Sequence, residues 1–150
     1  MSLEAGLAYG HLLAILSMVV FLSSEAALCR TEWMNEAVVR RLGRLDLIYG
    51  LSAVAVLLTG LSRLYWGMKG AAWYGANPWL YAKLALLVVI GLLAIRPSRL
   101  FILWRRELDA GGALPPLAQV RLARRHVMWQ AHLLALVPLG GVMMARGFGA

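Results

Sequence analysis

Four long apolar runs constrain this chain more than any other feature of its sequence. They cover residues 5–28, 47–61, 79–95 and 127–145, and each carries at most one or two ionisable groups. A hydrocarbon layer of about 30 Å is crossed by roughly 20 helical residues, so each run can span it once the middle two are lengthened into their flanks. Backbone polar groups cannot stay unpaired in lipid, and the runs lack the alternation of barrel strands. They therefore predict transmembrane helices.

The whole chain is expected to form one all-α domain, residues 1–150. Of its residues 61% are hydrophobic, against about 45–50% in a soluble domain. The predicted helices cover about 3–28, 46–66, 78–104 and 117–146, in a four-helix bundle with antiparallel neighbours.

Two details of these helices depend on single residues. Asp46 is expected at the N-terminus of the second helix, where its carboxylate suits the helix dipole. Pro97 is expected either to kink the third helix or to separate it from a short interfacial helix, SRLFILWRREL, in the second arginine-rich link.

The positive charge is concentrated on two links. The formal net charge is +8, and eleven of the fifteen Lys and Arg residues lie between the first and second helices or around the link from the third to the fourth. The positive-inside rule places these links in the cytoplasm and both termini outside, in a multi-pass protein of the bacterial inner membrane. Topology and anionic lipid account for the charge, so no nucleic-acid partner is expected.

Several kinds of site have no basis in the sequence. One cysteine, Cys29, excludes an internal disulfide and a cysteine-based zinc or iron–sulfur framework; it is expected to pack at the inner end of the first helix. No nucleophile–base pair, glycine-rich phosphate loop or carboxylate-rich metal site is visible.

Three basic groups are expected at one depth in the membrane. His11, Arg63 and Lys83 lie on the first three helices and fall within the outer third of the bilayer at 1.5 Å per residue. Lys83 follows Trp79 by four residues, so the two share a helix face. Ionisable groups in lipid require a partner or a function. Simple alternatives stay open: Arg63 and Lys83 snorkel to headgroups, and His11 is a hydrogen-bonded interior histidine.

The first helix carries a polar stripe that should face the bundle. Glu4, His11, Met18 and Glu25 recur every seven residues. Glu25 is expected to form an ion pair with Arg30, Arg96 or His132. His132 is expected roughly 12 Å from His11 in depth, so the two cannot ligate opposite faces of one haem within a subunit.

The segments RLDLIYGLSAVAVLLTGLSRLYWGMKG, WYGANPWLYAKLALLVVIGLL and GGVMMARGFG resemble a family of uncharacterised bacterial four-helix membrane proteins, a domain of unknown function. A more distant resemblance is to the HemJ-type protoporphyrinogen oxidases and the CopD-type copper-resistance proteins. HemJ-type proteins have a histidine early in their first helix and a W-x-x-x-K-L motif, matched here by His11 and by Trp79 to Leu84. This chain departs from the HemJ-type pattern, because it lacks the second histidine that follows shortly after the first in those proteins.

The distant resemblance implies a cofactor. It suggests b-type haem with His11 as the ligand to iron, and Lys83 nearby for a propionate, a substrate carboxylate or iron. Arg63 together with Lys83 suits the neutralisation of propionates. The function expected first is therefore a membrane b-type haem protein in electron transfer or porphyrin oxidation. The alternatives are an accessory subunit of a larger membrane complex without chemistry of its own, and a transporter or channel formed by an oligomer.

Overall fold

The computed structural model describes residues 3–67 and 69–148. These residues form five α-helices and one short 3-10 helix: α1 (Leu3–Leu28), η1 (Thr31–Trp33), α2 (Glu36–Trp66), α3 (Gly70–Ala76), α4 (Pro78–Asp109) and α5 (Leu117–Ala145). Helices α1, α2, α4 and α5 are each long and apolar enough to cross a membrane. The prediction of an all-α protein with four membrane-spanning helices is therefore confirmed.

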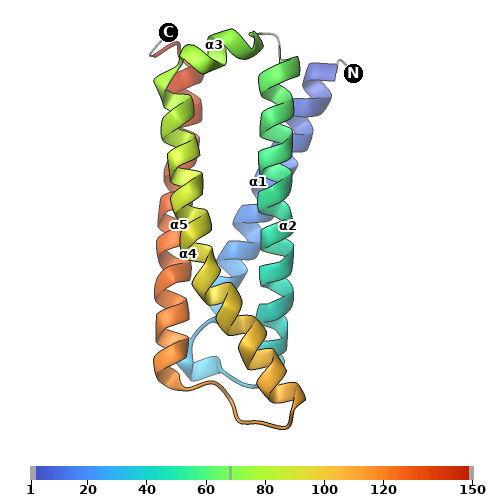
Figure 1. Ribbon diagram of the computed structural model, residues 1–150, viewed down its shortest axis with the longest axis vertical. Helices are drawn as coiled ribbons and strands as arrows, with labels where there is room; N and C mark the ends of the chain where they lie inside the picture. The colour runs from blue at the N-terminus through green and yellow to red at the C-terminus, as the bar shows by residue number, and fades with distance from the viewer. Residues whose placement is uncertain (1–2, 68, 149–150) are drawn as a thin grey trace.

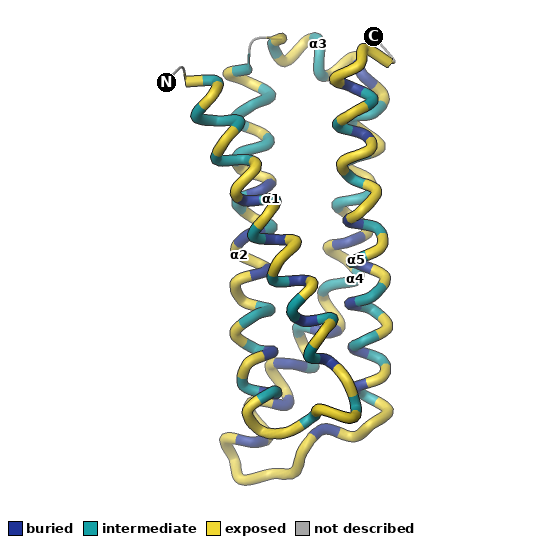
Figure 2. Tube along the Cα trace, turned by 180° about the vertical axis from the view of Figure 1, so that it is seen from behind, coloured by how far each residue is buried: buried dark blue, intermediate teal, exposed yellow. Residues whose placement is uncertain are grey.

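The four long helices associate as two pairs. Helix α1 lies along α2, and α4 lies along α5 (Figure 1). Both termini and α3 lie at one end of the bundle, which we call the terminal end. The opposite end holds η1 and the link between α4 and α5, and we call it the arginine-rich end. The two pairs approach each other towards the arginine-rich end and separate towards the terminal end (Figures 1 and 2).

Most of the core therefore lies in the arginine-rich half. Its centre is the edge-to-face pair Phe101 and Trp104 on α4, with ring centroids 5.4 Å apart. Leu22, Leu42 and Val127 bring α1, α2 and α5 against this region, and all are buried. In Figure 2 the buried stretches of the tube likewise concentrate in the lower half of the view. Large apolar side chains elsewhere on the long helices are exposed, as lipid-facing residues are: Leu51, Val54, Leu58, Val88 and Leu92 are examples.

Helix α2 begins at Glu36. The sequence predicts its start near Asp46, so that boundary is wrong. The Asn35 side chain caps it by accepting a hydrogen bond of 3.0 Å from the Val38 backbone N–H. The first turns of α2 bury Val39 and Leu42, so tertiary packing holds this arginine-containing segment in a helix. Asp46 consequently lies inside the helix and not at its N-terminus.

Helix α4 continues through Pro97 to Asp109, so of the two alternatives for Pro97 the separate interfacial helix is wrong, and the proline lies inside one helix. Pro97 is buried, and the residues after it include the core side chains Phe101 and Trp104. Their packing outweighs the hydrogen bond that a proline removes from a helix. The helix ends where Gly111 adopts a φ of 77°, a left-handed conformation typical of helix C-termini and favourable for glycine.

A short helix, α3, lies between α2 and α4. Met68 lies outside the described residues. Asn77 then caps α4, because its side-chain oxygen accepts a 3.0 Å hydrogen bond from the Trp79 N–H, and Pro78 occupies the first turn. The Asn77 amide also donates to the Phe148 carbonyl oxygen at 3.3 Å, which fixes the start of α4 against the end of the chain.

Candidate functional site

His11 is held against α2 by one side-chain hydrogen bond. Its Nδ1 lies 2.8 Å from Thr59 Oγ1, and the Thr59 hydroxyl donates to the Ala55 carbonyl oxygen at 2.6 Å. A hydroxyl has a single proton, so with that proton committed to Ala55 the oxygen accepts from His11 Nδ1–H. This arrangement leaves the lone pair on His11 Nε2, the nitrogen that is free to bind a metal.

A glycine on α2 leaves room for the imidazole. A Cβ added to Gly60 would lie 3.3 Å from His11 Cε1, a tight contact. The ring therefore rests on the helix surface between Thr59 and Gly60. His11 is partly buried, and the Met18 and Glu25 side chains that follow it on α1 are buried, so the predicted stripe does face the bundle.

Arg63 on α2 and Lys83 on α4 lie in the same half of the bundle as His11, towards the terminal end. Arg63 is one turn beyond Thr59, the hydrogen-bond partner of His11, whereas Lys83 packs on α5. Both side chains are partly buried, and neither has a hydrogen-bond or ion-pair partner among the described residues. The three basic groups thus form a cluster without a carboxylate to neutralise it, which we call the basic cluster.

Lys83 lies across the small residues of α5. A Cβ at Gly140 would come within 2.7 Å of Lys83 Cγ and 3.2 Å of its Cδ, and a Cβ at Gly141 would lie 4.0 Å from Nζ. The glycines therefore provide the groove in which the lysine stem packs. Trp79 is one turn before Lys83, and its carbonyl oxygen would lie 3.7 Å from the same Gly140 Cβ.

A second group of polar side chains, buried or partly buried, lies in the arginine-rich half. Glu25 on α1 and Gln130 on α5 are each 1% exposed. Tyr49 on α2 donates a 3.0 Å hydrogen bond to Gln130 Oε1, and Ser98 on α4 donates one of 2.7 Å to Asp46 Oδ1. Asp46 lies one turn before Tyr49 on the same face of α2. We call these five residues the buried polar group.

The predicted ion pair of Glu25 is wrong. The salt bridges among the described residues join Asp109 to Arg40 and to Arg105, and Glu25 Oε1 has no hydrogen-bond partner. His132 is exposed on α5, where its Nδ1 lies 2.6 Å from the Met128 carbonyl oxygen. It faces away from the bundle and is out of reach of Glu25.

The sequence reading missed Tyr49, Ser98 and Gln130 and misplaced Asp46. Asp46, Tyr49 and Ser52 are spaced by three residues, which places them on one face of a helix. This spacing is the sequence feature that indicates a shared polar face. It is hidden when the helix is predicted to begin at Asp46, because Asp46 is then not an interior residue of the helix.

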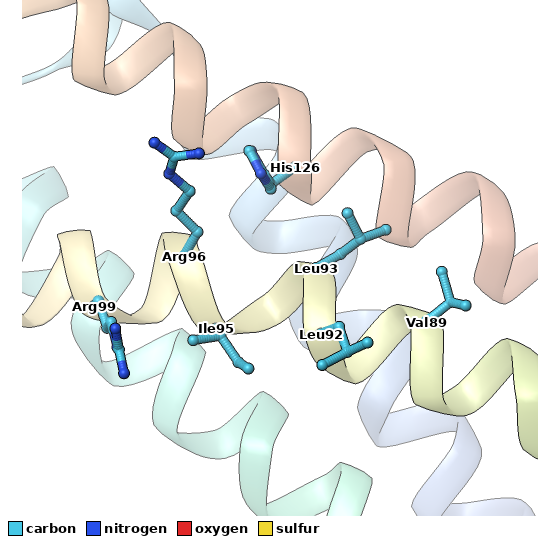
Figure 3. A pocket seen from close by; sticks show the side chains of 7 residues that line it. All are labelled: Val89, Leu92, Leu93, Ile95, Arg96, Arg99 and His126. Atoms are coloured by element: carbon cyan, nitrogen blue, oxygen red, sulfur yellow. The ribbon is translucent and has the colours of Figure 1, made fainter.

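A basic recess lies on the outside of α4 near the arginine-rich end. It has a volume of about 460 Å³ and is lined by aliphatic residues of α4 together with Arg96, Arg99 and His126. Arg96 extends towards α5 beside His126, whereas Arg99 points away from them (Figure 3). Guanidinium groups beside aliphatic side chains suit a lipid, because the cations can contact its headgroup and the aliphatic residues its acyl chains.

Metal binding by several protein ligands has no support here. No group of three or more His, Cys, Asp and Glu residues is arranged to hold a metal ion within residues 3–67 and 69–148. Cys29 is fully buried, as predicted, and burial raises the pKa of its thiol to about 12.

Comparisons with known proteins agree with this architecture. Comparison with curated proteins and with solved structures finds no match, so the resemblance to HemJ-type and CopD-type proteins stays a prediction. A family model described as "Predicted membrane protein (DUF2214)" matches residues 3–149. The chain, with its four membrane-spanning helices, therefore belongs to the DUF2214 family of predicted membrane proteins.

Proposed function

We propose that this protein is a membrane redox protein that binds b-type haem, with His11 as the axial ligand. The observation that carries the proposal is the hydrogen-bonded state of the imidazole. Its Nδ1–H is fixed by Thr59, whose hydroxyl is itself committed to Ala55. Histidines that bind metals are held in this way, with one ring nitrogen donating to a neighbour and the other free for the metal.

The basic cluster supports the same ligand. A haem carries two carboxylates as well as an apolar ring, and Arg63 and Lys83 are two cations without a carboxylate partner among the described residues. Charged groups in a membrane are costly when unpaired. Binding a dianionic ligand beside His11 would remove that cost for both side chains.

The residues have distinct roles in this proposal. His11 Nε2 holds the iron, Thr59 orients the imidazole, and Arg63 and Lys83 hold the propionates. Gly140 positions Lys83 by leaving the groove in which its stem lies. A bound haem supplies one-electron transfer, with a potential set by its axial ligation and surroundings. Porphyrin oxidation is the related reaction, in which the two cations would hold substrate carboxylates.

Absorbance spectra of the three single-histidine variants test the assignment. Protein made with abundant haem is purified in detergent and measured oxidised and dithionite-reduced, as wild type and as His11→Ala, His126→Ala and His132→Ala. We expect a Soret band with reduced α and β bands that only His11→Ala abolishes. His132 is the matched control, because it is also on a membrane-spanning helix but faces outwards.

Two outcomes would contradict the proposal. If folded wild-type protein supplied with haem is colourless, the redox assignment fails. An accessory subunit of a larger complex then becomes the better explanation, and copurification of a stoichiometric partner would test that role. If His11→Ala retains the band and His132→Ala loses it, the iron is bound at the other face of the protein.

We also propose an orientation and a location. The arginine-rich end faces the cytoplasm and both termini lie outside, in the inner membrane of a bacterium, because cationic links are retained on the cytoplasmic side. The same proposal includes association into an oligomer or with a larger membrane complex.

A further inference from the structure

A cavity lies between α2 and α4, with Met18 of α1 at its back, and has a volume of about 790 Å³. It extends from Leu57 and Leu84, nearer the terminal end, to Asp46 and Ser98. On α2 this range covers eleven residue steps, or about 16 Å of helix. Its long walls are aliphatic, and wall residues such as Leu51 and Val88 are exposed on the outside of the bundle. The cavity is therefore open sideways to the hydrocarbon of the bilayer.

Glycines keep this space open. Gly50 on α2 and Gly91 on α4 both line the cavity, and a Cβ at either would meet no atom within 4 Å. The two helices thus face each other with their smallest residues at mid-cavity. A ligand with an apolar body can enter there from the lipid without displacing a side chain.

One end of the cavity is polar. Asp46, Tyr49 and Ser98 line it at the arginine-rich end. The Ser98 hydroxyl donates a hydrogen bond to Asp46 Oδ1, and the Tyr49 hydroxyl donates one to Gln130 Oε1. Asp46 Oδ2 and the lone pairs of the Tyr49 oxygen remain as acceptors at the end of an otherwise apolar space.

The polar side chains behind this end are also incompletely bonded. Glu25 Oε1 and Gln130 Nε2 are buried and have no hydrogen-bond partner among the described residues. Nearly all buried polar side-chain atoms in native proteins have a partner, so each exception requires an explanation. Tyr49 connects this pair to the cavity, since it lines the cavity and also bonds Gln130.

These features restrict the chemistry of the ligand. An anionic headgroup is disfavoured, because Asp46 and Glu25 are acidic and no Lys or Arg lines the cavity. The free acceptors require a headgroup that donates hydrogen bonds, and the aliphatic walls require a long apolar body. A neutral, lipid-soluble molecule with hydroxyl groups at one end meets all three conditions.

We propose that this cavity binds a lipid-soluble quinol, whose ring hydroxyls donate to Asp46 and Tyr49 while its hydrocarbon tail lies between α2 and α4 and leaves towards the bilayer. The quinol site shares no residue with the basic cluster. It goes beyond the proposed haem function and does not depend on it, and its test has no haem readout.

Equilibrium binding of decylubiquinol to the detergent-purified full chain, followed by titration calorimetry at fixed detergent concentration, tests the proposal. The matched ligand is the dimethyl ether of the same quinol, which keeps the ring and the tail but has no hydroxyl to donate. We expect the quinol to bind at least about tenfold more tightly than the ether, because the ether loses both hydrogen bonds that the quinol donates.

Variants locate the binding. Asp46→Asn retains an oxygen for Ser98 but presents an amide in place of the free acceptor, and should weaken quinol binding about tenfold or more. Gly91→Leu should abolish it by filling the cavity. Gly10→Leu is the control, because Gly10 is also a helical glycine with no atom within 4 Å of an added Cβ but does not line the cavity. Thermal unfolding of each variant verifies that it is folded.

The opposite results would overturn the proposal. Equal binding of quinol and ether, or unchanged binding to both Asp46→Asn and Gly91→Leu, would mean that the quinol only partitions into the detergent around the protein. Displacement of quinol by oleate at equal concentration would show that the cavity accepts an anionic headgroup, contrary to the charge argument.

Discussion

Trp104 is the largest fully buried side chain among the described residues. Its indole N–H donates a 2.8 Å hydrogen bond to Gln119 Oε1, and its ring packs edge to face on Phe101. We expect Trp104→Ala to lower the free energy of unfolding by about 3–5 kcal/mol, because it leaves a cavity and removes the contacts of a whole ring. Thermal or denaturant unfolding in detergent measures the change.

Trp129 offers the comparison within the same chain. It is 58% exposed on α5, so Trp129→Ala should change the free energy of unfolding by much less than Trp104→Ala. Equal losses for the two variants would show that the packing around Trp104 does not carry the stability assigned to it.

Cys29 is expected to be chemically silent in the folded protein. Its side chain is fully buried and its Sγ lies 3.8 Å from the Val120 carbonyl oxygen. Burial raises the pKa of the thiol to about 12, so at pH 8 only about one molecule in ten thousand carries the reactive thiolate. A maleimide should therefore label wild-type protein only after denaturation, with the rate measured by mass spectrometry.

The control for this measurement is Ala113→Cys in a Cys29→Ala background. Residue 113 is exposed in the link between α4 and α5, so its thiol should react rapidly under native conditions. Rapid native labelling of Cys29 in wild-type protein would mean that the end of α1 opens readily, against the packing described here.

At the scale of elements, the contact between α4 and α5 depends on Gly140 and Lys83. A Cβ at Gly140 would lie 2.7 Å from Lys83 Cγ, so Gly140→Ala should be destabilising while Lys83 is present. In a Lys83→Ala background the obstructing methylene is gone, and the same substitution should cost far less. A double-mutant cycle on the free energy of unfolding should give a coupling of about 0.5–3 kcal/mol, the range for residues in contact.

Gly91→Ala is the matched control for this cycle, because a Cβ there meets no atom within 4 Å. Its effect should be additive with Lys83→Ala. If Gly140→Ala is instead additive with Lys83→Ala, the lysine stem does not occupy the groove on α5.

The elements show which features of the fold are readable from the sequence. The hydrophobic runs predict four spanning helices because lipid leaves the backbone few alternatives. Helix boundaries in the arginine-rich half are not predictable from the sequence in this way, since long-range packing decides them. Glu36 to Arg44 is polar enough to suggest a loop, yet Val39 and Leu42 are buried against the rest of the core. Pro97 suggests a break, yet the core around Phe101 and Trp104 holds α4 continuous.

The same distinction applies to the candidate sites. His11, Arg63 and Lys83 stand out in the sequence because each is an ionisable group within a membrane-spanning helix; the structure packs His11 against α2 and Lys83 against α5. The buried polar group is not readable in this way. Tyr49, Ser98 and Gln130 are uncharged, come from three helices, and are brought together only by the convergence of the two helix pairs.

The whole protein is expected to lie in the membrane with its arginine-rich end in the cytoplasm and both termini outside. We expect a membrane-impermeant maleimide to label Gly75→Cys in intact cells and Ala113→Cys only in inverted membrane vesicles, both in the Cys29→Ala background. Both sites are exposed, one on α3 at the terminal end and one at the arginine-rich end. The reverse pattern would show that the arginine-rich end is translocated, against the positive-inside rule.

The uneven contact between the two helix pairs gives the protein a gradient of stability along the membrane normal. The arginine-rich half holds the buried aromatic and aliphatic side chains, whereas at the terminal end the pairs stand apart and are joined through α3 (Figure 1). Regions with few buried apolar contacts open at a lower free-energy cost than the core. We therefore expect the terminal half to open before the arginine-rich half, so that the width of its open side responds to the lipid chains around it.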